Sequence, residues 1–96
     1  MKTTLTSLAL ILALGTVAQA DIKIGATISE TGPASSLGDP EAKTLKLLVD
    51  EINAKGGIKG EKIKLIMYDD GADPNKAKSF ATRLIEDDQV SVIIGG

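Results

Sequence analysis

The chain has 96 residues, a formal net charge of −2 and no cysteine, so disulfide bonds and thiolate metal sites are excluded. Tyr68 and Phe80 are the only aromatic residues, and acidic residues outnumber basic ones. Nucleic-acid binding uses a basic field and stacking surfaces, and because this composition supplies neither, we expect no nucleic-acid partner.

Residues 1–20 have the three parts of a cleavable secretory signal. Lys2 gives a positive start, an apolar stretch runs from Leu8 to Val17, and Ala18-Gln19-Ala20 supplies small residues for cleavage. A membrane anchor is the alternative, but the apolar stretch is shorter than the roughly 20 residues that a spanning helix needs. A lipid anchor at the processed end would require a cysteine. We therefore expect a soluble protein that is exported to the periplasm and begins at Asp21.

The remaining residues, 21–96, form one small domain in this interpretation. The leader holds one lysine, so ten basic and 13 acidic residues remain and the net charge becomes −3. A domain of this size buries only about 60% of the surface that its unfolded chain exposes. Its stability as an isolated unit is therefore expected to be marginal.

The first half of this domain has the pattern of a strand, a loop and a helix. Alternating apolar residues predict a strand over 22–28, and the Ser, Thr, Gly and Pro residues of 29–38 predict a loop. Asp39-Pro40 has the pattern of an N-cap followed by a first-turn proline, which predicts a helix from there to about Lys55. Its apolar stripe comprises Ala42, Leu45, Leu48, Val49 and Ile52, and Gly56-Gly57 ends it.

The second half repeats this order. Residues 62–68 are apolar on both sides, as in the buried strands of parallel sheets. Asp73-Pro74 predicts the start of a second helix, and Val90 to Ile94 form a third predicted strand. The apolar stripe of the second helix comprises Ala77, Phe80, Ala81, Leu84 and Ile85.

Strands that alternate with helices predict an α/β fold, here a three-stranded parallel βαβαβ sheet. If both crossovers are right-handed and the helices lie on opposite faces, the strand order is 2-1-3 and the third strand is an edge. Ligands of such sheets bind at the carboxyl ends of the strands, where the winding reverses. The loop 29–38 and the residues that follow Gly95-Gly96 reach that position.

Several segments together carry a resemblance to a known family. The most specific is Asp50 to Gly60, with the sequence DEINAKGGIKG; the others are Gly32-Pro33, Leu37-Gly38-Asp39, Tyr68-Asp69-Asp70 with Asp73-Pro74, and Ile93-Ile94-Gly95. The chain thereby resembles the first lobe of the periplasmic substrate-binding proteins of branched-chain amino acid ABC transporters, which have a type I periplasmic-binding fold. The resemblance implies that residues 21–96 are the N-terminal part of a longer, two-lobed receptor.

The resemblance also implies a function without catalysis and without a cofactor. Receptors of this family close their two lobes on a small-molecule ligand, here a branched-chain amino acid, and deliver it to a membrane ABC permease. Leu37 corresponds to a position that contacts the ligand's side chain and that often carries an aromatic residue. Gly95 and Gly96 lead into the helix start that, in the family, holds the ligand's carboxylate.

Two further hydroxyls, those of Ser35 and Ser36, lie near the predicted cleft and are candidate ligand contacts. Serines of surface loops more often bond their own backbone, so the structural role stays open for both. We expect the charge of Asp39 to repel a carboxylate from the start of the first helix.

Two alternative functions stay open. The first is a receptor of the same fold for amides, urea or small organic acids, since one fold serves many ligands. The second is an enzyme in which Asp69 and Asp70 hold Mg²⁺ for phosphotransfer, because Mg²⁺ prefers oxygen ligands. The chain has no histidine to share acid–base work, and an exported protein does not meet cytoplasmic kinases. We therefore assign no catalytic or metal-binding residue.

Overall fold

The computed structural model describes residues 21–95, and the leader predicted for residues 1–20 lies outside them, as does Gly96. The elements are β1 (Ile22–Ile28), α2 (Ser35–Ala54), β2 (Ile63–Asp69), α3 (Pro74–Glu86) and β3 (Val92–Gly95). The strands are parallel and their order is β2-β1-β3, which confirms the predicted class and order. Among these described helices, neither combines the length and the apolar character that crossing a bilayer requires.

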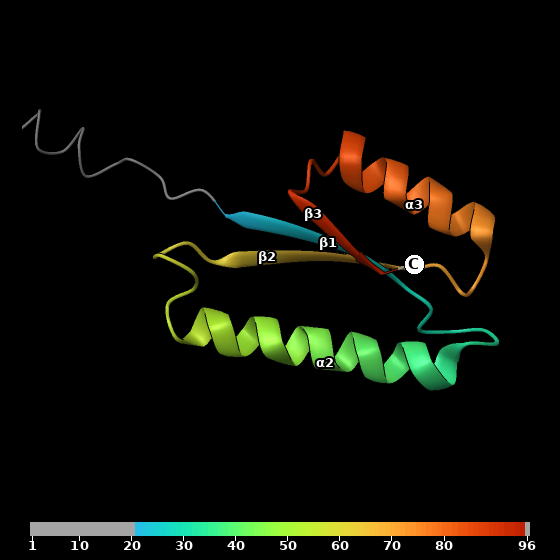
Figure 1. Cartoon of the computed structure of the whole chain (residues 1–96), viewed down its shortest axis with the longest axis horizontal. Helices are drawn as coiled ribbons and strands as arrows, with labels where there is room; N and C mark the ends of the chain where they lie inside the picture. Colours follow the sequence, from blue (N-terminus) through green and yellow to red (C-terminus); the bar gives the residue numbers. More distant parts are fainter. Residues whose placement is uncertain (1–20, 96) are drawn as a thin grey trace, which may run out of the picture.

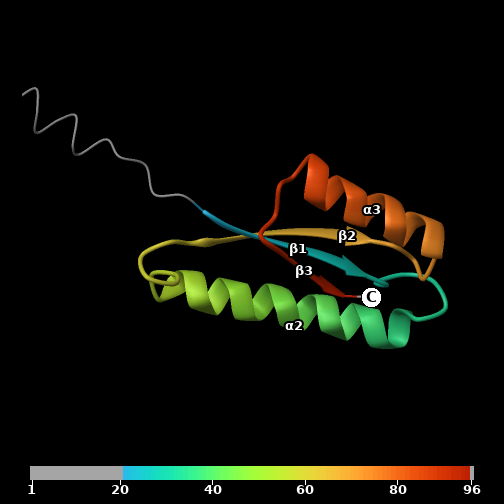
Figure 2. The ribbon, with the colours of Figure 1, turned by 45° about the horizontal axis from the view of Figure 1, so that its top comes forward.

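The two helices cover opposite faces of the sheet (Figure 1), and the tilted view shows the same three layers (Figure 2). On the α2 face, Ala26 and Ile28 of β1 pack with Ala42, and Leu45, Leu65 and Met67 surround them. This is the expected consequence of period-2 alternation in β1 and period-3.6 spacing in α2.

On the α3 face, β1 has no side chain at Gly25, so a residue of α3 can approach the strand backbone. A Cβ atom at Gly25 would lie 2.8 Å from Cδ2 of Leu84, so Leu84 packs directly on the strand backbone and is 0% exposed. Tyr68 of β2 stacks on Phe80 of α3 with ring centroids 4.8 Å apart, and its hydroxyl donates to Asp88 at 2.7 Å. These contacts fix α3 against β1 and β2.

Two residues that we predicted to lie in the apolar stripes are exposed. Leu48 of α2 and Ile85 of α3 are 49% and 62% exposed. The prediction was wrong at these positions, since the three described strands leave both side chains largely uncovered. Leu48 instead borders an apolar groove between α2 and the last residues of β3.

The helix starts were predicted with unequal success, although both contain Asp-Pro. Asp73 caps α3 as predicted, because its carboxylate accepts hydrogen bonds from the backbone N–H groups of Asn75 and Lys76. Helix α2 begins at Ser35, not at Asp39, and Pro40 lies inside it. Asp39 is thus no N-cap, and its carboxylate pairs with Lys43 one turn later at 2.8 Å.

Candidate functional site

The carboxyl ends of β1 and β2 are joined by the side chain of Asp69. Its carboxylate accepts hydrogen bonds from the backbone N–H groups of Glu30 and Thr31, from the Thr31 hydroxyl at 2.7 Å, and from the Gly71 N–H at 3.0 Å. The Thr31 hydroxyl, followed by the Gly71 N–H, lowers the pKa of Asp69 below its ordinary value of 3.8. The ionised carboxylate therefore holds the loop after β1 in place.

This bonding gives a prediction for acid stability. Because the folded state lowers the pKa of Asp69, the stabilisation is complete above pH 3.8 and is lost as the pH falls through the lower folded pKa. An Asp69→Asn chain should unfold at a lower urea concentration at pH 7, and the difference from the parent chain should shrink below pH 3.8. Urea titrations followed by circular dichroism at several pH values measure this. Asp39→Asn is the control, since an exposed pair such as Asp39–Lys43 contributes little; equal effects of the two substitutions would contradict the role of Asp69.

Asp70 has a second anchoring role one residue later. It is only 6% exposed and accepts hydrogen bonds from the Ser29 hydroxyl at 2.6 Å and from the Ala72 N–H at 2.9 Å. The oxygens of Asp69 and Asp70 thus bond neighbouring loop donors, which is how carboxylates order a loop. Within residues 21–95, no three potential metal ligands come together. These contacts give Asp69 and Asp70 a structural role in place of the magnesium site considered above.

Gly38 explains why α2 begins earlier than predicted. A Cβ atom at Gly38 would lie 1.7 Å from the carbonyl oxygen of Ser29, so the helix backbone contacts the end of β1 directly. The N–H groups of Leu37 and Gly38 both donate to the carbonyl of Ala34, which closes the first turn before Pro40 is reached. The loop after β1 is therefore limited to residues 29–34.

The predicted contact residues consequently lie in a helix and not in a loop. Ser35, Ser36 and Leu37 form the first turn of α2. Because no acidic residue lies in that turn and Ala34 is the N-cap, the expected repulsion of a carboxylate by Asp39 is also wrong. Leu37 is 68% exposed.

A pocket of about 170 Å³ lies where β1, β3 and the start of α2 meet. Leu37 and Gly95 line it, whereas Ser35 and Ser36 do not, and Gly96 lies outside the described residues. The other lining residues are Thr27, Ile28, Ser29, Ala34, Gly38, Glu41 and Asp70. The pocket thus occupies the predicted place at the carboxyl ends of the strands, where the winding reverses.

Sequence reasoning missed Glu41 and Asp70 as members of this pocket. Glu41 follows Leu37 by four residues and therefore shares its helix face, which would have been evident with the correct helix start. Asp70 had been considered only as a metal ligand. Its position directly after β2 was the available signal.

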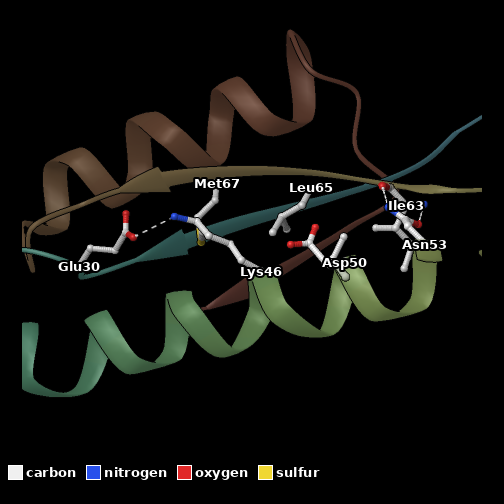
Figure 3. A pocket seen from close by; sticks show the side chains of 8 residues that line it. Glu30, Lys46, Asp50, Asn53, Ile63, Leu65 and Met67 are labelled. Atoms are coloured by element: carbon white, nitrogen blue, oxygen red, sulfur yellow. Dashed lines mark hydrogen bonds and ion pairs between the residues drawn. The ribbon is translucent and has the colours of Figure 1, made fainter. Parts of the chain in front are cut away.

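A larger hollow of about 520 Å³ lies elsewhere, between α2 and the outer edge of β2 (Figure 3). Lys46 reaches Glu30 across it with 3.7 Å between Nζ and Oε1, and the Asn53 side chain bonds both the N–H and the carbonyl of Ile63 at 2.8 Å. Although it is the larger hollow, it runs along a strand edge and not at the carboxyl ends of the strands. We therefore place the candidate site at the smaller pocket.

Comparisons with known proteins agree with this fold. The family model described as "Periplasmic binding protein" matches residues 21–96. The Leu/Ile/Val-binding protein homolog 7 of Brucella suis is 46% identical over 89 residues, which are 93% of this chain and 22% of the relative. The Leu/Ile/Val-binding protein of Escherichia coli is 39% identical over 75 residues, covering 78% of this chain and 20% of the relative.

A solved structure gives the same result. The branched-chain amino acid transporter substrate binding protein LivJ from Streptococcus pneumoniae, in complex with isoleucine, matches with a TM-score of 0.77 and 38% identity, over 80% of this chain and 22% of that one. The chain spans about a fifth of the length of the relatives it matches. Proteins of this family bind solutes and do not catalyse reactions, which argues against the phosphotransfer alternative. On the family match and these likenesses, the chain belongs to the periplasmic binding proteins.

Proposed function

We propose that residues 21–95 form part of the first lobe of an exported solute receptor that supplies a branched-chain amino acid to a membrane ABC permease. The observation that carries the proposal is the pocket at the carboxyl ends of β1 and β3. It lies in a chain that is 46% identical to a Leu/Ile/Val-binding protein homolog. The apolar side chains of Ile28, Ala34 and Leu37 supply the surface that an aliphatic ligand would contact.

The size of the pocket indicates that it is one wall of a cleft. Sites for small molecules usually have volumes of roughly 300–1,000 Å³, and this pocket has about 170 Å³. An open wall leaves its polar groups in exchange with water, so hydrogen bonds to a ligand add little net affinity. A second lobe would complete the site, and a ligand that contacts both lobes would favour the closed state.

A chimeric receptor tests this function. Residues 21–96 would replace the matching segment of the Escherichia coli Leu/Ile/Val-binding protein, which is 39% identical. We expect the chimera to bind leucine, isoleucine or valine in calorimetry, and the 96-residue chain alone to show no binding heat. Micromolar binding by the chain alone would contradict the two-lobe argument. A folded chimera that binds no amino acid would contradict the ligand class.

Polar residues of the same pocket support a second candidate, a receptor for amides or urea. Glu41 and Asp70 bring carboxylates to the pocket, and Thr27 and Ser29 bring hydroxyls. Carboxylates accept hydrogen bonds, and amides and urea are donors of such bonds. Titration of the same chimera with acetamide and urea distinguishes the candidates, because an amide receptor would prefer these ligands to leucine.

Leu37 gives a prediction about selectivity. In the chimera, Leu37→Trp should change the relative affinities for leucine, isoleucine and valine, because Leu37 lines the pocket while most of its side chain is exposed. One methylene in an apolar pocket changes affinity by about 10- to 200-fold, which sets the scale of the expected change. Leu47→Trp is the matched control, since Leu47 is exposed on the same helix and does not line the pocket. Equal ligand profiles for the two variants would remove Leu37 from the site.

A further inference from the structure

The carboxylate of Asp70 is anchored through only one of its two oxygens. The Ser29 hydroxyl and the Ala72 N–H both donate to Oδ1, at 2.6 and 2.9 Å. No donor within residues 21–95 bonds Oδ2. Across the same residues, no side-chain oxygen or nitrogen is both fully enclosed and without a partner. Oδ2 therefore keeps contact with solvent, although Asp70 as a whole is only 6% exposed.

Asp70 lies where two hollows meet at the carboxyl ends of the strands. Ser29 and Asp70 line both the candidate pocket and an adjoining hollow of about 250 Å³ at the start of α3. Thr27, also only 6% exposed, lines the candidate pocket, and its hydroxyl has no hydrogen-bond partner among the described residues. Asp70 follows β2, which β1 separates from β3, so its bonds do not depend on the open edge at β3.

The charge of Asp70 has no cation beside it. Neither of the two ion pairs in the described part of the chain includes Asp70. No lysine or arginine is among the described residues that line the two hollows, whereas Glu41 and Asp73 add carboxylates. Asp73 already caps α3, and Glu41 is exposed to water. Asp70 thus carries the charge that is both buried and unpaired, and burying a charge is costly unless it is paired.

We infer that Asp70 contacts the ligand directly and that its Oδ2 binds the ammonium group of the solute; this inference rests on the proposed function. An ammonium would donate a charge-assisted hydrogen bond to Oδ2, and the Thr27 hydroxyl offers a second acceptor. A neutral amide would donate a bond but leave the charge of Asp70 uncompensated, and an organic acid without an amino group would be repelled. The solute class at this wall is therefore one with a cationic nitrogen, as in amino acids.

Replacing Asp70 with asparagine isolates this oxygen. Asp70→Asn keeps one oxygen that accepts from Ser29 and Ala72, and it replaces the other with an NH₂ group that only donates. In the chimeric receptor we expect the affinity for leucine to fall by about 10- to 100-fold, the scale of a hydrogen bond to a charged group. The affinity for isocaproate, which is leucine without its amino group, should not fall. Calorimetry measures both affinities, and circular dichroism reports whether the variant is folded.

Two further substitutions complete the experiment. Asp39→Asn removes one negative charge from a residue that lines neither hollow, so it should leave both affinities unchanged. Thr27→Val keeps the shape of the side chain and removes its hydroxyl. It should therefore weaken the binding of leucine but not of isocaproate, which gives a second test if Asp70→Asn does not fold.

The possible outcomes separate this inference from the proposed function. A folded parent chimera that binds no leucine would overturn both. If the parent binds leucine, an unchanged leucine affinity in folded Asp70→Asn would overturn the inference alone, as would an unchanged affinity in Thr27→Val where the asparagine variant does not fold. Equal losses of leucine and isocaproate would also overturn it, because they would give Asp70 a purely structural role.

Discussion

Replacing Gly38 with alanine should lower the free energy of unfolding of the chain. The added Cβ atom would lie 1.7 Å from the backbone carbonyl oxygen of Ser29, so the first turn of α2 has to move away from β1. Overpacking of this kind costs about 1–3 kcal/mol and sometimes more. The better helix propensity of alanine recovers at most about 1 kcal/mol. Because the obstacle is backbone and cannot rotate away, the steric cost outweighs the gain in propensity.

The measurement is a urea titration followed by circular dichroism, in enough sucrose to keep the parent chain folded. Ser36→Ala is the control: Ser36 is exposed in the same helix turn, and its replacement should change the free energy of unfolding by less than about 0.5 kcal/mol. A Gly38→Ala chain that unfolds at the same urea concentration as the parent would show that α2 does not need this close approach to Ser29.

The second large effect is expected at the contact between Leu84 and Gly25. Leu84 is 0% exposed, and its truncation in Leu84→Ala should lower the free energy of unfolding by about 2–5 kcal/mol, because it leaves a cavity over β1. Gly25→Ala should also destabilise the chain, but less, since the atoms in its way are the ends of the Leu84 and Val90 side chains at 2.8–3.1 Å.

The double variant Gly25→Ala/Leu84→Ala tests whether Gly25 and Leu84 are in direct contact or affect the free energy of unfolding independently. Its new methyl group would occupy part of the cavity that Leu84 leaves, so its destabilisation should be smaller than the sum of the single effects by about 0.5–3 kcal/mol. The same urea titration measures this coupling. Combining Leu84→Ala with Ser36→Ala, on the opposite side of the sheet, should be additive. Additive effects in the Gly25 and Leu84 pair would contradict direct packing of Leu84 on the strand.

Periodicity predicted the sheet because the information is local. Apolar alternation in β1 and the Asp73-Pro74 start of α3 are signals that lie within a few residues, and both proved correct. The Asp39-Pro40 signal failed because a contact from outside the helix decides its start. Gly38 has to lie against Ser29, a residue nine positions earlier, and no local propensity contains that requirement.

In the candidate site, too, some features could be predicted from the sequence and others depend on contacts between distant residues. Topology placed the pocket at the carboxyl ends of β1 and β3, with Leu37 and Gly95 at its wall. The burial of Asp70 and its bond to Ser29 arise from residues 41 positions apart, so sequence spacing offered no indication of them. The earlier helix start then moved Ser35 and Ser36 away from the pocket and brought Glu41 to it.

The carboxylates of Asp69 and Asp70 have a consequence for how fast a ligand would be captured. They bond Ser29, Glu30 and Thr31, which belong to the chain itself, and these bonds restrain the loop at the pocket wall. On the proposed function, a solute would meet a contact surface that these bonds already order, and would not depend on a rare competent form, whose scarcity would reduce the apparent affinity in proportion. Capture at this wall would therefore be limited by diffusion and by the motion of whatever closes over it. Loosening the loop, as in Asp69→Asn, would slow association before it changed which solute is chosen.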